Sequence, residues 1–218
     1  MRLFKTSFFL MAGALGISAC SAGLESKKVS EFDPKRDALG FSRAYFASGC
    51  FWCVEAVFES VNGVREVISG YSGGHSENPT YQSTNTGRTG HAEAVEIFYD
   101  PDVVSFAQLV EAYFGSMDPT QVNGQGPDRG SQYRSIAFYQ NEDEKRTIEK
   151  AIERLNREVY NGKIAVEVKP FEKFWLAEAY HQNYERLNPN SGYIRNVSIP
   201  RLNRFQEKFP ELLKKEDH

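Results

Sequence analysis

Residues 49–55 read Gly49-Cys50-Phe51-Trp52-Cys53-Val54-Glu55, and this stretch organises the rest of the chain. It follows a strand-like segment, residues 43–47, and leads into a predicted helix over residues 53–61. The glycine indicates a strand-to-helix turn with Cys50 at the start of the helix. A thiol there faces unpaired N–H groups and the positive end of the helix dipole, so we expect its pKa to fall. The stretch therefore predicts a redox-active cysteine.

The remaining pattern interleaves strands with helices. We predict strands over residues 64–71, 94–99, 133–140 and 165–169, and helices over 105–117, 141–160 and 176–187, two of them opened by the capping pairs Ser105 with Gln108 and Asn141 with Glu144. This order predicts an α+β protein, a two-layer α/β sandwich. The connections 72–90 and 117–132 are long, and loops of that length usually serve function. We expect them to fold over the helix that starts at Cys50.

The N-terminus has the features of an export signal. Arg2 and Lys5 precede an apolar run over residues 8–17, and small residues then lead to Cys20. Residues 17–20 resemble the bacterial lipobox, in which cleavage leaves a lipid-modified cysteine; an ordinary signal peptide with an incidental cysteine is the alternative. We expect a protein lipid-anchored through Cys20, facing the periplasm or exterior, and Ser21 favours the outer membrane.

Length and charge bound the remaining possibilities. The chain has 218 residues and a formal net charge of −3. A mildly acidic chain has no overall positive potential that would attract nucleic acid. We expect a signal peptide over 1–19, a lipidated tether over 20–43, a catalytic domain over 44–210 and a charged tail over 211–218. This size suits a single domain, and we expect a monomer.

Several blocks together resemble the peptide methionine sulfoxide reductase A family. They are residues 49–52 with Glu55-Ala56, Asn78-Pro79-Thr80-Tyr81, residues 87–95 (Gly-Arg-Thr-Gly-His-Ala-Glu-Ala-Val), residues 130–135 (Gly-Ser-Gln-Tyr-Arg-Ser) and residues 179–184 (Ala-Tyr-His-Gln-Asn-Tyr). Their order is that of the family, and the similarity runs from about Tyr45 to about Asn190. The resemblance implies a ferredoxin-like core with long irregular loops. It also implies reduction of the S epimer of methionine sulfoxide, free or in proteins, as a repair of oxidised proteins.

The resemblance carries roles onto individual residues. Cys50 would attack the sulfoxide sulfur and become a sulfenic acid. Glu93 would stay neutral in an apolar pocket and give a proton to the sulfoxide oxygen. Phe51 and Trp52 would hold the substrate's methyl group, Tyr81 and Tyr133 would reach its oxygen, and Asp128 and Tyr184 would complete the pocket. Core packing is the alternative for the two aromatic neighbours of Cys50, and a solvated strand position is the alternative for Glu93.

Cys53 is where the chain departs from the commoner family pattern. Many members have glycine there and resolve the oxidised cysteine with a distant one in Gly-Tyr-Cys, whereas this chain reads Gly192-Tyr193-Ile194 with no later cysteine. Cys53 then either forms a disulfide with Cys50 or remains passive while an external thiol attacks the sulfenic acid. In both cases a dithiol or a thioredoxin-like protein supplies the electrons. A zinc half-site is the rival interpretation, but no second cysteine pair exists, so we expect no metal and no bound cofactor.

Two other function classes remain open from the residues alone. A general thiol–disulfide oxidoreductase is compatible with the C-x-x-C spacing, although that chemistry does not need the block over residues 87–95. A lipid-anchored binding module could use the aromatic residues without turnover. Activity on disulfides alone would favour the first, and a Cys50→Ser variant with full function would favour the second.

Overall fold

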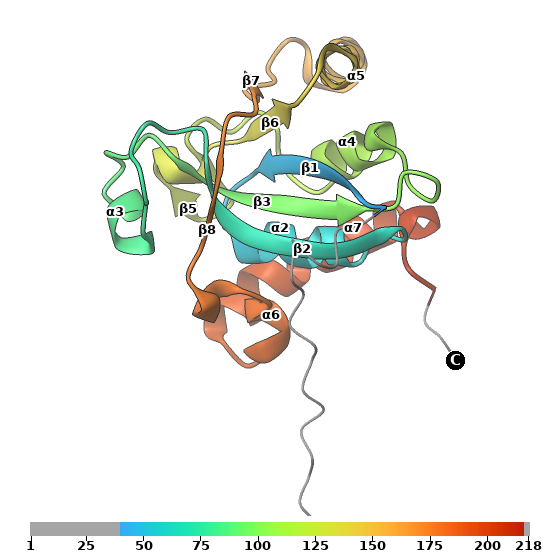
Figure 1. Ribbon diagram of the computed structural model, residues 1–218. Helices are drawn as coiled ribbons and strands as arrows, with labels where there is room; N and C mark the ends of the chain where they lie inside the picture. The colour runs from blue at the N-terminus through green and yellow to red at the C-terminus, as the bar shows by residue number, and fades with distance from the viewer. Residues whose placement is uncertain (1–39, 216–218) are drawn as a thin grey trace, which may run out of the picture. The chain divides into compact units, whose positions relative to one another are not determined.

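The computed structural model describes residues 40–215, and within this range six strands form one mixed sheet (Figure 1). Their order across the sheet is β7-β6-β1-β3-β2-β8. The strands are β1 (Ser42–Ala47), β2 (Val64–Ser72), β3 (Ala92–Tyr99), β6 (Ile136–Tyr139), β7 (Glu167–Pro170) and β8 (Phe174–Leu176). Neighbours pair antiparallel except β6 and β7, which are parallel.

Two helices connect the central strands across one face of this sheet. They are α2 (Phe51–Glu59), which joins β1 to β2, and α4 (Phe106–Gly115), which joins β3 to β6. The order β6-β1-β3-β2 with these two crossovers is that of a ferredoxin-like fold, so the predicted α+β class and core are confirmed. The other helices are α3 (Tyr81–Asn85), α5 (Glu142–Leu155), α6 (Tyr184–Leu187) and α7 (Ile199–Lys208), and a small hairpin pairs β4 (Gly124–Gln125) with β5 (Asp128–Arg129).

The alternation of side chains along the strands separates two apolar clusters. In β1, Ala44 and Phe46 pack under the helices, whereas Tyr45 and Ala47 pack on the opposite face. In β3 the same period of two places Ala92 and Ala94 on that opposite face. Glu93, between them, therefore points toward the helical face, where α2 begins. Strand register alone brings this carboxyl to the predicted nucleophile.

The helix starts follow their capping residues. Ser105 accepts a hydrogen bond from the Gln108 N–H, and the Gln108 side chain bonds back, which is the predicted capping box. The Asn141 side chain accepts from the Glu144 N–H at 2.9 Å and caps α5, which continues as a π-helical turn over Asn156–Tyr160. The predicted helix over 53–61 begins earlier than expected, at Phe51, because Cys50 is its N-cap.

The predicted helix over residues 176–187 is wrong. The segment contains the end of β8, a 3₁₀ turn over Ala179–His181 and the four-residue α6. Asn183 has φ +55, a left-handed conformation that a continuous helix does not allow. β8 forms instead because the edge of β2 is open: Gly70, Tyr71 and Ser72 pair with residues 174–176. Tertiary pairing has overridden the local periodicity.

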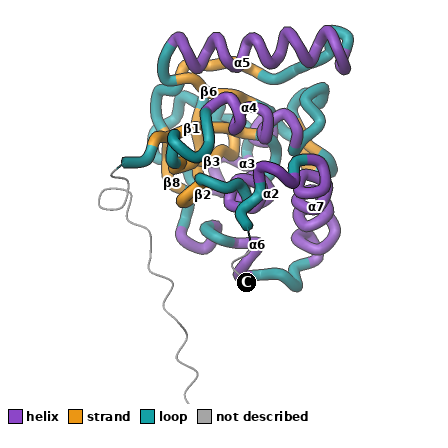
Figure 2. The backbone as a smooth tube through the Cα atoms, turned by 90° about the vertical axis from the view of Figure 1, so that its right-hand side faces the viewer, coloured by secondary structure: helices purple, strands orange, loops and turns teal. Residues whose placement is uncertain are grey.

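The C-terminal helix α7 was not predicted, and it packs against α2 on the helical face of the sheet. Figure 2 shows α7 beside α2. It also shows α5 near β6, at the edge of the sheet. No helix within residues 40–215 has the length and apolar character needed to cross a membrane. Cys20 and the rest of the expected signal and tether up to residue 39 lie outside the described residues.

Candidate active site

The turn between β1 and α2 places Cys50 at the start of the helix, as predicted. The Cys50 carbonyl accepts from the N–H groups of Cys53 and Val54, at 3.2 and 3.4 Å, which closes the first turn of α2. Gly49 has φ +81, and a Cβ there would lie 2.6 Å from Cβ of Gln125. The turn therefore requires glycine both for its backbone conformation and for the close approach of the 124–129 hairpin.

Arg201 of α7 holds this turn in place through hydrogen bonds. Nothing in the sequence indicated this role of Arg201. Its side chain is buried and donates to the Ser116 carbonyl, to the Ser48 carbonyl and to the Ser48 hydroxyl, each at 2.8 Å. These three charge-assisted bonds give each nitrogen of the buried guanidinium one hydrogen-bond partner. An arginine 153 residues away in the chain thus becomes part of the Cys50 turn.

Glu93 lies against the first residue of α2. Its side chain is 1% exposed, and its Oε2 accepts a hydrogen bond from the Phe51 N–H at 3.0 Å. Burial raises the pKa of Glu93 to about 8, against the lowering effect of that hydrogen bond. The carboxyl is therefore mostly protonated at pH 7 and has a proton to give. The role of Glu93 as the catalytic acid stays a prediction. Its burial at the start of α2 suits that role.

Tyr81 and Tyr133 converge on the same place from two long connections. Burial raises the pKa of both phenols, with further raising effects from Glu93 and Cys50, and their hydroxyls interact with each other. Both side chains are half-buried and neutral. The expectation that the connections 72–90 and 117–132 fold over the start of α2 therefore agrees with where α3 and the 131–133 turn lie.

An aromatic box stands beside Cys50. Trp52 stacks on Tyr184 with ring centroids 3.8 Å apart, and its indole N–H donates to Nδ1 of His181 at 3.2 Å. Phe51 is fully buried and packs on His181 and Tyr71. Trp52 and Tyr184, both half-buried, thus form the wall that can contact a ligand, whereas Phe51 is also part of the core.

Cys53 follows Trp52 in α2 and is buried beside Tyr193, within reach of the Arg201 charge. Its sulfur lies 3.7 Å from the Tyr193 hydroxyl, which donates to Oδ2 of Asp128 at 2.6 Å. A hydrogen bond from Cys50 lowers the pKa of Cys53 to about 6, helped by the Arg201 charge and opposed by burial. The Cys53 thiol therefore ionises more readily than the Cys50 thiol.

The expected fall in the pKa of Cys50 is wrong for the protein without substrate. Burial raises the pKa of Cys50, and the neighbouring Cys53 and Glu93 raise it further. Two interacting thiols hold one negative charge between them, and it favours Cys53 because the Arg201 charge and a hydrogen bond from Ser198 lower the pKa of Cys53 and not that of Cys50. The dipole of α2 favours a thiolate at Cys50, but desolvation and the second thiol outweigh it.

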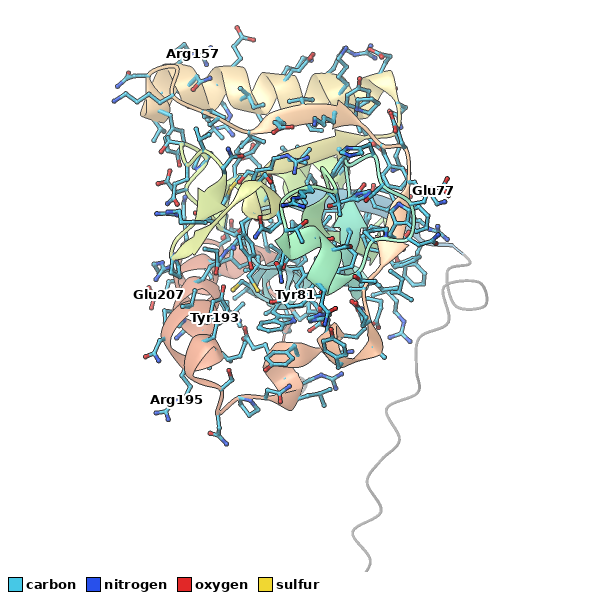
Figure 3. All side chains as sticks on the ribbon, turned by 90° about the vertical axis from the view of Figure 1, so that its left-hand side faces the viewer. Glu77, Tyr81, Arg157, Tyr193, Arg195 and Glu207 are labelled. Atoms are coloured by element: carbon cyan, nitrogen blue, oxygen red, sulfur yellow. The ribbon has the colours of Figure 1, made fainter. Side chains whose placement is uncertain are left out.

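Asp128 acts electrostatically on Glu93 and Tyr133, and its place in the substrate pocket stays a prediction. It accepts from the Tyr193 hydroxyl and from the Cys50 backbone N–H, so it connects the turn to the Cys53 side of the site. The sequence did not indicate a role for Tyr193, which was mentioned only because isoleucine follows it where many family members have cysteine. Its ring meets Trp52 edge-on at 5.9 Å, so Tyr193 lies between the aromatic box and Asp128. Figure 3 shows Tyr81 and Tyr193 on the same face of the described domain.

The arrangement brings two thiols and a buried carboxyl together around one helix start, and the sequence matches a known family. A sequence profile described as peptide methionine sulfoxide reductase matches residues 42–213. The chain belongs to the peptide methionine sulfoxide reductase family. Within residues 40–215 no group of three or more His, Cys, Asp or Glu side chains is placed to hold a metal ion.

Individual relatives agree with this assignment. The chain is 44% identical over 185 residues to the peptide methionine sulfoxide reductase MsrA 1 of Rhodopirellula baltica, which covers 85% of this chain and 96% of that protein. Methionine sulfoxide reductase A of Corynebacterium diphtheriae has a similar structure, with TM-score 0.63, 35% identity, and coverage of 70% of this chain and 77% of that one. Reduced Mxr1 of Saccharomyces cerevisiae gives TM-score 0.65, 30% identity, and coverage of 75% and 92%. The chain is therefore an oxidoreductase of this family, which sets aside the binding-module alternative.

Proposed function

We propose that this chain reduces the S epimer of methionine sulfoxide, free or in proteins, to methionine through thiol chemistry at Cys50. The observation that carries the proposal is the meeting of Cys50 with a protonated, buried Glu93 at the first turn of α2. Sulfoxide reduction requires a sulfur nucleophile and a proton for the departing oxygen, and this site holds both within one helical turn.

The pocket residues suggest how the substrate would lie. The methyl group and side chain of the sulfoxide would rest against Trp52 and Tyr184, and the oxygen would accept hydrogen bonds from Glu93 and the two phenols, Tyr81 and Tyr133. Cys50 would lose its proton as its sulfur bonds to the sulfoxide sulfur, while the oxygen takes the Glu93 proton. The hydroxyl formed on the substrate would pass to Cys50 as methionine leaves, and Glu93 would regain its proton from the one that Cys50 lost, so that Cys50 remains as a sulfenic acid.

Cys53 would then resolve the sulfenic acid. As a thiolate it would attack the Cys50 sulfur and form the Cys50–Cys53 disulfide, and the displaced hydroxide would take a proton from solvent and leave as water. A disulfide between residues three apart requires the first turn of α2 to open. An external dithiol or a thioredoxin-like protein would return both thiols.

The epimer assay tests the function itself. The full-length protein with dithiothreitol is expected to consume methionine S-sulfoxide and leave the R epimer untouched, because one face of the sulfur must meet Cys50 while the oxygen meets Glu93. Chiral chromatography of the remaining sulfoxide measures both. Equal consumption of the two epimers would contradict the assigned pocket.

Glu93→Gln is expected to slow the single-turnover rate by roughly a hundredfold, because an amide has no proton of the right acidity to give. In the wild type the rate falls as pH rises through about 8, where Glu93 loses its proton. The variant loses that descending limb. Single-turnover rates from pH 6 to 10 measure it, and an unchanged profile would show that Glu93 is not the acid.

Glu96→Gln is the matched control for that variant. Glu96 lies on the same strand, but it faces the opposite side of the sheet and pairs with Tyr45 and Arg43. Its substitution is expected to leave the descending limb near pH 8 in place. Loss of the limb in both variants would indicate a general effect on β3.

We also propose that the protein is exported and anchored through lipid on Cys20. The proposal rests on the sequence of residues 1–20, and acyl chains contribute about 0.8 kcal/mol per buried methylene. Palmitate labelling in cells is expected to mark the wild type and not a Cys20→Ser variant. Equal labelling of the two would contradict the lipid assignment.

A further inference from the structure

Glu178, on the segment between β8 and α6, is a carboxylate that joins groups from two sides of the pocket. Its Oε1 accepts a hydrogen bond from the Tyr81 backbone N–H at the start of α3, at 2.9 Å. Its Oε2 accepts from the Tyr71 hydroxyl of β2, at 2.9 Å, and lies 3.8 Å from Nε2 of His181. Burial alone would raise the pKa of Glu178, but the hydrogen bonds it accepts lower it, so the group is ionised at neutral pH.

His181 connects that carboxylate to Trp52. The His181 side chain is buried, and its Nδ1 accepts a hydrogen bond from the Trp52 indole N–H at 3.2 Å. Burial lowers the pKa of His181, against the raising effect of Glu178, so the ring is neutral at pH 7 and its one proton is on Nε2. That N–H makes no hydrogen bond within residues 40–215, and the Glu178 carboxylate is the charge that it faces. A negative oxygen there favours the tautomer that leaves Nδ1 free to accept from Trp52.

We propose that Glu178 is a positioning residue for sulfoxide reduction, which holds the Tyr81 segment directly and the Trp52 indole through His181. The assignment rests on the roles that the proposed function gives to Tyr81 and Trp52, and it adds what sets their geometry. Tyr81 would reach the sulfoxide oxygen, and Trp52 would hold the methyl group. One carboxylate between them would fix how far apart these two contacts lie.

The segment that carries Glu178 has other anchors, so a change of this side chain is not expected to release it. The Gln182 side chain accepts from the Ser69 N–H at 2.9 Å and donates to the Ser69 carbonyl at 3.0 Å. The Ala177 N–H donates to the same carbonyl at 3.1 Å, and the Glu55 carboxyl accepts from the Asn183 N–H. The Glu178 side chain itself is 33% exposed. Its contacts therefore serve the site more than the core.

A substitution of the same shape tests the path through His181. Glu178→Gln keeps an oxygen for the Tyr81 N–H but places an amide NH₂ against Nε2 of His181. Because two donors cannot bond to each other, the His181 proton is expected to move to Nδ1, and the Trp52 indole N–H then loses its acceptor.

NMR measures this change without turnover. The chain has two tryptophans, so a Trp175→Phe variant assigns the two indole N–H signals. In Glu178→Gln the Trp52 signal is expected to shift and to exchange with solvent about tenfold faster than in the wild type. A Trp52 signal that keeps its wild-type position and exchange rate would overturn the assignment.

Single-turnover kinetics with methionine S-sulfoxide then separate the two arms of the carboxylate. Glu178→Gln is expected to raise the half-saturating substrate concentration about fivefold and to change the maximal rate by less than about twofold, because the Tyr81 arm remains. Glu178→Ala loses both arms, so its maximal rate is expected to fall about tenfold as well.

Glu172→Gln is the matched control, since Glu172 is an exposed carboxylate just before β8. Its kinetics and its Trp52 signal are expected to match those of the wild type. Equal maximal rates in Glu178→Gln and Glu178→Ala, or the same changes in the control, would overturn the assignment. If the alanine variant does not fold, the glutamine variant still decides through the Trp52 signal. Absence of turnover in the wild type would instead count against the proposed function.

Discussion

Replacing Cys50 by serine is expected to lower kcat/KM for methionine S-sulfoxide by at least about a thousandfold, because a serine hydroxyl ionises too weakly to attack sulfur. The fold should remain. Cys50 is the N-cap of α2 and makes no side-chain capping bond, and serine is a preferred residue at that position. Single-turnover release of methionine measures the chemistry, and the urea midpoint measures the stability. Residual activity of a few per cent at an unchanged midpoint would contradict Cys50 as the nucleophile.

Cys53→Ala is expected to separate the first turnover from the following ones. The first turnover should persist or become faster, because Cys53 raises the pKa of Cys50 and its removal relieves that effect. Steady-state turnover with a thioredoxin should fall by about a hundredfold, since no thiolate remains to form the disulfide that such reductants attack.

Two measurements check this separation. Methionine released per protein molecule without reductant should stay near one, while turnover with thioredoxin is followed over many cycles. Full recycling of the alanine variant by thioredoxin would make Cys53 a passive helix residue and favour direct attack on a Cys50 sulfenic acid. Loss of the first turnover as well would instead give Cys53 a part in the chemical step.

Local pattern accounts for the core of the fold and for the position of the main chemical groups. The alternation in β1 and β3 placed Glu93 on the face of the sheet where α2 begins, and Gly49 marked the turn that presents Cys50. The capping pair at Ser105 predicted the start of α4. These features depend on residues close together in the chain, so a sequence shows them directly.

What the sequence did not predict depends on contacts between distant segments. β8 forms in place of a helix because it pairs with β2, about a hundred residues earlier. Arg201 and Tyr193 enter the site from the C-terminal segment, and nothing in their local sequence indicates a buried role. The Arg201 charge also helps to explain why the negative charge favours Cys53, whereas the dipole of α2 alone favours Cys50.

Mixing the reduced full-length protein with one equivalent of methionine S-sulfoxide and no reductant shows whether Cys50 and Cys53 act as a pair. We expect one methionine released per molecule, with Cys50 and Cys53 both closed to alkylation and joined in one peptide pair by mass spectrometry. Release of methionine with Cys50 carrying one added oxygen and Cys53 still open to alkylation would contradict the resolving role of Cys53. Failure to release methionine at all would contradict the function.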